Sequence, residues 1–161
     1  DNPITENNGD DFMIRKIAES DREVFISLSE EFYASPAVLH PVPREYHEAA
    51  FDELMRSGEY ADAFIVEADG KTVGFALTAK SYSRESGGKV LWLEELYIKP
   101  EYRSLGLGRE YFAYIEDFAR REGFARIRLE VEEENVRARA LYARLGYLPL
   151  EYCQMIKDLR G

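Results

Sequence analysis

Cysteine is almost absent from this sequence, and no run of apolar residues approaches the roughly 20 needed to cross a bilayer. The single cysteine, Cys153, cannot form a disulfide within the chain. This fits a protein of the reducing cytoplasm, which is the location we expect, without association with membranes. Only two histidines are present, His40 and His47, and neither has Cys or His partners at metal-ligand spacing. No metal site is predicted.

Basic residues are also in deficit, with 21 Lys and Arg against 31 Asp and Glu and a net charge of −10. This sign disfavours nucleic acid as a partner. The deficit is uneven, because residues 1–98 carry a net charge of −11 and residues 99–161 carry +1. An acidic first half beside a locally basic second half suits a cationic acceptor next to an anionic donor. Solvated helix faces that keep the protein soluble explain the pattern equally well.

The length of 161 residues favours one domain. Residues 1–11 form a polar, acidic tail, and residues 12–161 are predicted to form a single domain with a mixed α/β fold. The expected strands are Phe12–Ile17, Asp62–Ala68, Thr72–Ser81, Val90–Ile98, Ala125–Val131 and one or two closing strands in Tyr147–Leu159. Asp69-Gly70 predicts a hairpin between the second and third of these strands. The expected helices are one capped by Ser20, then Arg44–Arg56, Leu107–Arg121 and one from the cap Asn135 to Gly146.

Residues 103–108 read Arg-Ser-Leu-Gly-Leu-Gly and join an apolar strand to an amphipathic helix. Glycines at 106 and 108 allow the backbone to approach a ligand closely, and the amides of the first helical turn favour an anion. Arg103 and Arg109 flank the turn and add charge. A nucleoside-triphosphate loop and a dinucleotide loop both require other residues at positions 109–111. The turn therefore predicts a site for a pyrophosphate of another kind of ligand.

Two glutamates, Glu94 and Glu95, interrupt the apolar run Val90–Ile98. Consecutive strand residues face opposite sides, so we expect one carboxylate on each side of this strand. Burying an ionised group is costly unless it is partnered or wetted. A carboxylate here could serve as a general base for an alkylamine, of which only about one molecule in 10³ to 10⁴ is neutral at pH 7. The alternative is that the strand splays and both groups simply meet water.

Asn135 and Tyr142 are seven residues apart, two helical turns, and lie on about the same face of the last predicted helix. Asn135 is a plausible helix cap by itself. Tyr142 could equally be a core aromatic, because Ala138, Leu141 and Leu145 share much of that face.

The order of elements, the Arg-x-x-Gly-x-Gly turn and the later Asn135…Ala138…Leu141-Tyr142…Gly146-Tyr147 pattern together resemble the GNAT superfamily of acyl-CoA N-acyltransferases over about residues 12–158. Leu-Trp-Leu-Glu-Glu-Leu at 91–96, followed by Tyr102-Arg103, looks like the diamine (spermidine/spermine) acetyltransferase branch, which has Leu-Glu-Asp-Phe there. The resemblance implies a mixed, mostly antiparallel sheet of six to seven strands, splayed near the fourth and fifth, with about four flanking helices. It also implies a possible homodimer.

The resemblance further implies roles for individual residues, with acetyl-CoA as co-substrate and no metal. Glu94 would be the general base, with Glu95 as the reserve candidate, and Tyr142 would give a proton to the departing CoA thiolate. The residues expected to bind acetyl-CoA are Leu96, Tyr97, Ile98, Arg103, Ser104, Leu105, Gly106, Leu107, Gly108, Arg109, Asn135 and Tyr142.

The expected acceptor is a primary amine, such as a polyamine, an aminoglycoside, another small amine or an amine of a peptide or protein. The residues expected to line its pocket are Trp92, Tyr33, Tyr46, Glu30 and Glu31. Cys153 is expected to be a small core residue of the terminal strand, which favours direct transfer in a ternary complex over an acyl-enzyme. The rival interpretation is a non-catalytic acyl-CoA-binding or regulatory module. An acyl donor larger than acetyl also stays open.

Overall fold

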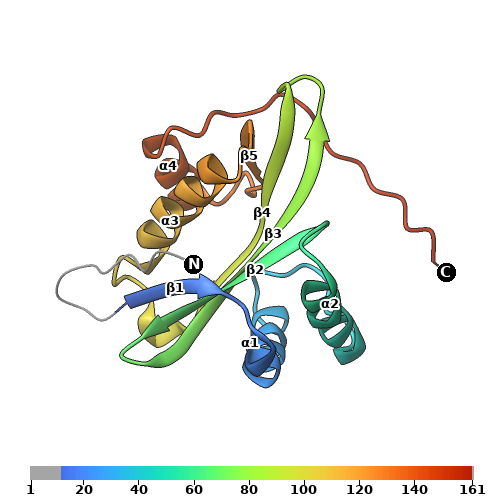
Figure 1. The fold of residues 1–161 in the computed structure, drawn as a ribbon. Coiled ribbons are helices and arrows are strands. Elements are labelled where there is room, and N and C mark those ends of the chain that lie inside the picture. The colour runs from blue at the N-terminus through green and yellow to red at the C-terminus, as the bar shows by residue number, and fades with distance from the viewer. Residues whose placement is uncertain (1–11, 161) are drawn as a thin grey trace. The chain divides into compact units, whose positions relative to one another are not determined.

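The computed structural model describes residues 12–160, and the predicted tail at residues 1–11 lies outside them. The chain divides after Leu129 into two compact units, each of which is described by itself. The first unit contains the sheet and three of the α-helices, and the second contains the last helix and the residues that follow it (Figure 1).

A five-stranded sheet is the centre of the first unit, and its strands follow chain order. The first four strands pair in antiparallel fashion, whereas β5 runs parallel to β4. The strands are β1 (Phe12–Lys16), β2 (Ala61–Ala68), β3 (Lys71–Ser83), β4 (Gly88–Ile98) and β5 (Arg126–Leu129). The predicted hairpin between β2 and β3 is confirmed. Its turn residues Asp69 and Gly70 both have positive φ, 50° and 73°, as a tight hairpin turn requires.

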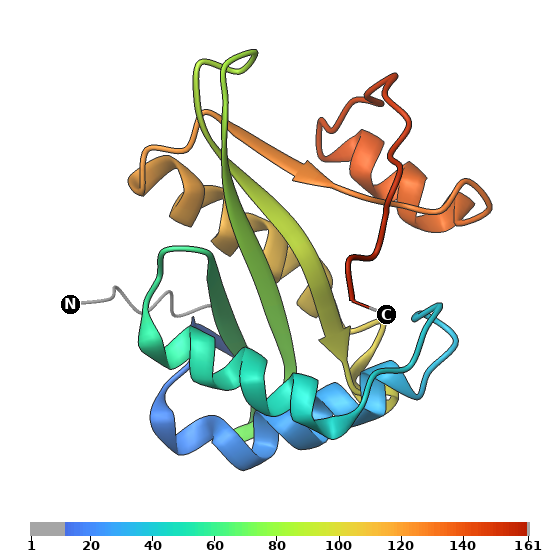
Figure 2. The ribbon, with the colours of Figure 1, turned by 90° about the vertical axis from the view of Figure 1, so that its right-hand side faces the viewer.

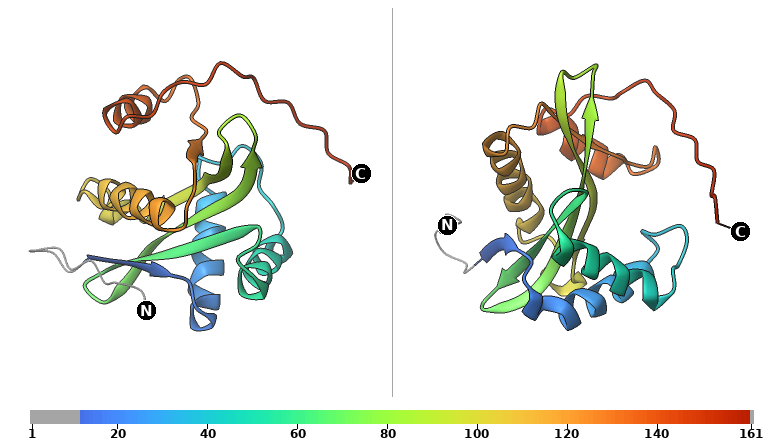
Figure 3. Two further views of the ribbon diagram at one scale, coloured as in Figure 1. Left: turned by 45° about the horizontal axis from the view of Figure 1, so that its top comes forward. Right: turned by 45° about the vertical axis from the view of Figure 1, so that its right-hand side comes forward.

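Helices cover both faces of this sheet. Helices α1 (Arg22–Tyr33) and α2 (Arg44–Arg56) pack on one face, and α3 (Leu107–Arg121) packs on the other (Figures 2 and 3). Two short 3₁₀ turns, Glu19–Asp21 and Pro100–Tyr102, precede α1 and α3. Among residues 12–160, no helix is both long and apolar enough to cross a membrane.

Each face of the sheet buries its own apolar cluster. The cluster under α1 and α2 comprises Phe25, Ile26, Leu28, Phe51, Ala63, Ile65, Phe75 and Tyr97. On the opposite face, Val66, Ile98 and Leu107 belong to a second cluster, and the ring of Phe64 meets that of Phe118 edge-on at 5.2 Å. Each fully buried side chain of this size stabilises the fold by about 1.5–3 kcal/mol. The two clusters therefore fix β4 from both sides.

The start of α1 differs from the prediction that Ser20 caps it. Asp21 supplies the local hydrogen bond instead, since its carboxylate accepts from the Ala18 N–H at 2.7 Å. The same carboxylate pairs with Arg15 at 2.8 Å, and this bond is the main cause that lowers the pKa of Asp21. The ion pair with Arg15 of β1 thus holds the 3₁₀ turn that precedes the helix.

The second unit contains α4 (Val136–Arg144), and the predicted Asn135 cap is confirmed. Its side-chain oxygen accepts from the Ala138 N–H at 3.2 Å. The predicted closing strands in Tyr147–Leu159 are wrong: the structure has no strand there, and five strands instead of six to seven among the described residues. A strand needs a neighbouring backbone to pair with, and most apolar side chains of this segment are exposed. Cys153 is also exposed, not a core residue.

The close packing of β3 on β4 yields a stability prediction at Gly74. A Cβ atom there would lie 2.3 Å from the Tyr97 carbonyl oxygen and 2.7 Å from the Ile98 side chain. We expect Gly74→Ala to lower the free energy of unfolding by about 1–3 kcal/mol, measured by chemical denaturation. Gly58→Ala is the matched control, because its Cβ would make ordinary contacts at 3.4 and 3.5 Å. Equal stability of the two variants would contradict the packing described here.

Candidate functional site

A β-bulge lies in β4 at the glutamate pair. Leu93 pairs with Thr78, but Glu95 pairs with the next residue of β3, Leu77, so Glu94 is the extra residue that the register skips. The strict alternation predicted for Val90–Ile98 is therefore wrong, because the extra residue shifts every later side chain by one face. The carboxyl group of Glu95 lies on the α1 side of the sheet, and Glu94 is exposed at the bulge.

Beyond the bulge, one edge of β4 has no strand beside it. The parallel pairing with β5 covers only Val90–Leu93, whereas β4 continues to Ile98. The predicted splay between the fourth and fifth strands is thus confirmed. Over residues 94–98, no strand of the described chain pairs with this edge, so it presents backbone donors and acceptors to an extended ligand that carries amides.

The glycine-rich turn follows directly after this strand. Ser104 and Gly106 both have positive φ, 65° and 87°, and Gly106 is the N-cap residue of α3. No side chain caps this helix, so the amides of its first turn keep their capacity to bind an anion. Arg109 is exposed and makes no ion pair within residues 12–160. These features fit the predicted diphosphate site.

Arg103 ties the turn to the strand. Its Nε donates to the Ile98 carbonyl oxygen at 2.8 Å, and its guanidinium lies 5.6 Å from the centre of the Tyr97 ring. Part of its hydrogen-bonding capacity is thus already used within the protein. Arg103 therefore holds the turn in place as well as adding positive charge.

Tyr33, the last residue of α1, reaches β4 beside the bulge. Its hydroxyl donates to Glu95 Oε1 at 3.0 Å, and its ring meets that of His47 at 5.0 Å. Burial is the main cause that raises the pKa of Glu95; the bond from Tyr33 opposes this rise, and the charge of Glu94 adds to it. Burial also raises the pKa of Tyr33, so the hydroxyl keeps its proton.

The other four residues expected to line the acceptor pocket lie in different surroundings. Glu31 accepts from the Tyr97 hydroxyl at 3.2 Å and so lies against β4. Glu30 is instead paired with Arg44 at 2.8 Å. Trp92 donates to Ser81 at 3.2 Å. Tyr46 is 53% exposed.

His47 is the residue near Glu95 that the sequence did not single out. It lies on the apolar side of α2, four residues before the buried Phe51, and is itself only 6% exposed. That spacing was the available signal. The ring of His47 packs against that of Tyr33. Among residues 12–160, no group of three or more His, Cys, Asp or Glu could hold a metal.

Asn135 and Tyr142 belong to the second unit and are described within it. Asn135 caps α4, as above, and Tyr142 lies near the end of this helix with its ring 6.1 Å from that of Tyr147. Burial raises the pKa of Tyr142, so its hydroxyl is protonated at neutral pH and can act as a proton donor.

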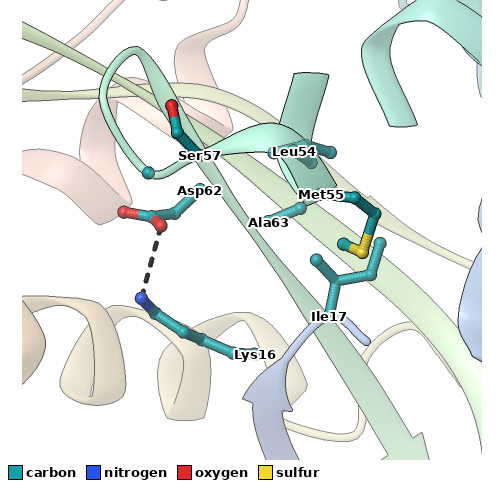
Figure 4. Close-up of a pocket in the computed structure, with 8 residues that line it drawn as sticks. Lys16, Ile17, Leu54, Met55, Ser57, Asp62 and Ala63 are labelled. Carbon is teal, nitrogen blue, oxygen red and sulfur yellow. Dashed lines mark ion pairs between the residues drawn. The ribbon is translucent and has the colours of Figure 1, made fainter. Parts of the chain in front are cut away.

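A separate pocket of about 210 Å³ lies between the end of β1, the end of α2 and the start of β2 (Figure 4). None of the predicted site residues lines it. Asp62, which is buried, pairs there with Lys16 at 3.3 Å and also with Lys80 at 2.7 Å. Its charge is thus neutralised by the protein itself, which indicates a structural ion pair.

Comparison with known proteins agrees with this geometry. Residues 22–147 match the model of the Acetyltransferase (GNAT) family. Thialysine N-epsilon-acetyltransferase of Bos taurus is 39% identical over 74 residues, which are 46% of this chain and 43% of that protein. The match thus spans less than half the length of this relative.

Solved structures share the fold over nearly the whole chain. A possible acetyltransferase from Clostridium difficile 630 has a TM-score of 0.81 at 20% identity, covering 93% of this chain and 99% of that one. An aminoglycoside N-acetyltransferase in complex with CoA has a TM-score of 0.77 at 20% identity, covering 95% and 98%.

Changing each of the two glycines of the turn to alanine gives opposite predictions for stability and the same prediction for affinity. Gly108 has no positive φ, and a Cβ there would meet nothing within 4 Å. We expect Gly108→Ala to raise the free energy of unfolding by about 0.5–1 kcal/mol, because alanine is the better helix former. We also expect calorimetry to show an affinity for CoA that is about tenfold lower, because the methyl group obstructs the diphosphate at the first-turn amides.

Gly106→Ala is the companion variant. Its φ of 87° imposes a backbone cost on alanine of about 1–2 kcal/mol, so this variant should lose both stability and affinity. If Gly108→Ala binds CoA as tightly as the unchanged protein, the turn does not hold the diphosphate.

Proposed function

Because this chain belongs to the acetyltransferase (GNAT) family, we propose that it transfers the acetyl group of acetyl-CoA directly to a primary amine. One observation carries the proposal. The unpaired edge of β4, the glutamate bulge and the uncapped glycine turn follow one another within residues 94–108. A donor with a diphosphate at one end and an amide-bearing arm would thereby present its thioester near the two carboxylates.

The backbone supplies most of the proposed binding. The amides from Gly106 to Arg109 would hold the diphosphate, assisted by the charges of Arg103 and Arg109. The main chain of Leu96–Ile98 would pair with the amides of the pantetheine arm, and the Leu96 N–H would stabilise the oxyanion that develops on the thioester carbonyl. Asn135 would contact the same arm. When bound, acetyl-CoA supplies the activated acetyl group.

Glu94 is the proposed general base. An alkylammonium at pH 7 must lose a proton before its nitrogen can attack, a handicap of roughly 4–5 kcal/mol. The exposed position of Glu94 at the bulge allows it to take this proton directly or through water and to return it to solvent. Glu95 is the second carboxylate of the same bulge.

Tyr142 is the proposed general acid. As the amine nitrogen forms its bond to the acetyl carbon, the bond from that carbon to sulfur breaks and leaves a thiolate. The hydroxyl of Tyr142, kept protonated by its raised pKa, would give its proton to this sulfur. Transfer would be direct, in a ternary complex and without an acyl-enzyme.

The proposed acceptor is a small cationic amine. Thialysine and aminoglycosides appear in the names of two proteins that this chain is similar to, and both carry amines. Polyamines fit the diamine branch that the sequence resembles, and a peptide amine fits the same chemistry. The acidic balance of residues 1–98 favours each of these over an anionic acceptor.

Two substitutions test the assigned acid and base. We expect Glu94→Gln to lower kcat about 10² to 10⁴-fold and Tyr142→Phe to lower it by at least tenfold, with both variants still binding acetyl-CoA. Steady-state kinetics and calorimetry provide the two measurements. Cys153→Ser is the control and should keep full activity. Wild-type rates in both variants would show that these residues are not the acid and base.

A panel of amines tests the reaction itself. With acetyl-CoA as donor, we expect cationic primary amines to release free CoA thiol, detected with a thiol reagent, and acidic amines to release little. Longer acyl-CoA donors in the same assay would define the acyl group. If acetyl-CoA binds but no amine releases thiol, the chain is instead a non-catalytic acyl-CoA-binding module.

A further inference from the structure

We propose that Tyr33 is a positioning residue for Glu95, and that Glu95 so held receives the ammonium charge of the acceptor while Glu94 takes its proton. This inference rests on the proposed function. It divides the two carboxylates of the bulge between two tasks, and it assigns a role to a residue on a different element, α1. The geometry around Tyr33 carries it.

The hydroxyl of Tyr33 is held in place before any substrate arrives. Its ring packs edge-on against Phe32 at 5.5 Å and against the buried His47 at 5.0 Å. The side chain is therefore fixed by neighbours on α1 and α2, and its bond to Glu95 Oε1 at 3.0 Å costs little further side-chain entropy. One oxygen of Glu95 is thus engaged, which leaves the other to turn toward a ligand.

A second hydrogen bond between α1 and β4, with its donor on β4 instead of α1, strengthens the contact between the helix and the strand. Tyr97 of β4 donates to Glu31 of α1 at 3.2 Å, while Tyr33 of α1 donates to Glu95 of β4. The two crossed bonds hold the C-terminal turn of α1 against the strand just after the bulge. Glu95 consequently has a defined orientation in spite of the irregular backbone next to it.

Glu95 lacks the cationic partner that several nearby carboxylates have. Several carboxylates of α1 and α2 have cations of their own: Arg44 pairs with Glu30 and Glu48, and Arg22 pairs with Asp52 at 2.7 Å. Glu95 has no Lys, Arg or His within ion-pair distance among residues 12–160, although much of its carboxyl group is buried. A buried carboxylate with one neutral donor is incompletely compensated. An ammonium group of the acceptor would supply the missing charge.

The titratable groups that face Glu95 determine the sign of the expected pH effect. They are Tyr33 and Glu31 on α1, His47 on α2 behind Tyr33, and Glu94 and Tyr97 on β4. The residue paired with it on β3, Leu77, does not titrate. Donation from Tyr33 favours the ionised carboxylate and lowers its pKa, whereas burial and Glu94 raise it. Removing the hydroxyl must therefore raise the pKa of Glu95.

The variant Tyr33→Phe tests this, since it removes the hydroxyl and keeps the ring that packs against His47. We expect the acid limb of the kcat/KM profile for the amine to move up by about one pH unit. On this acid limb the KM for the amine should rise about tenfold, while kcat and the KM for acetyl-CoA change little. The ¹³C resonance of the Glu95 carboxyl group, followed by NMR titration, should move in the same direction.

Two control variants isolate the effect. Tyr60→Phe makes the same change at an exposed tyrosine and should alter neither the kcat/KM profile nor the NMR titration of Glu95. In a Glu95→Gln background, Tyr33→Phe should produce no further shift of the acid limb, because the group it acts on is gone. Thermal denaturation establishes that each variant is folded at the assay temperature.

The readouts separate failure of this inference from failure of the proposed function. An unchanged Glu95 titration in Tyr33→Phe overturns the inference, and so does a shifted titration with an unchanged KM for the amine; in both cases acetyl transfer stands. A wild-type protein that acetylates no amine overturns the proposed function, and the NMR titration still reports whether Tyr33 controls the ionisation of Glu95.

Discussion

One extra residue in β4 is the constraint on which the candidate site depends. The bulge at Glu94 moves all later side chains by one face, so Tyr97 packs under α1 and Ile98 packs toward α3. It also places two carboxylates next to each other in different surroundings, one exposed and one largely buried. Two like groups whose surroundings differ are suited to different tasks. In a regular strand the two carboxylates would instead lie on opposite faces of the sheet.

Sequence reasoning recovered the features that local chemistry decides. The hairpin at Asp69-Gly70, the helix Leu107–Arg121 and the Asn135 cap depend on residues that are close in the chain, and all three are confirmed. The glycine turn was predictable for the same reason, because its function requires backbone conformations that few residues adopt.

The features that sequence reasoning missed depend on distant residues. The bulge at Glu94 is defined only by the register with β3, and no glycine or proline marks it. Residues 147–159 have a strand-like composition, but pairing requires a partner that composition does not specify. The bond from Tyr33 to Glu95 spans 62 positions in sequence. The roles of Asn135 and Tyr142, the homodimer and the cytoplasmic location stay predictions.

Arg103 connects the glycine turn to β4, and so connects the proposed diphosphate site to the strand that carries the two carboxylates. Through its bond to the Ile98 carbonyl oxygen and its contact with Tyr97, the glycine turn is coupled to β4, and through Tyr97 and Glu31 to α1. A ligand that shifts the turn would therefore act on α1 through these contacts. By reciprocity, a factor by which one substrate changes the affinity for the other through this linkage is the same factor by which the second changes the affinity for the first.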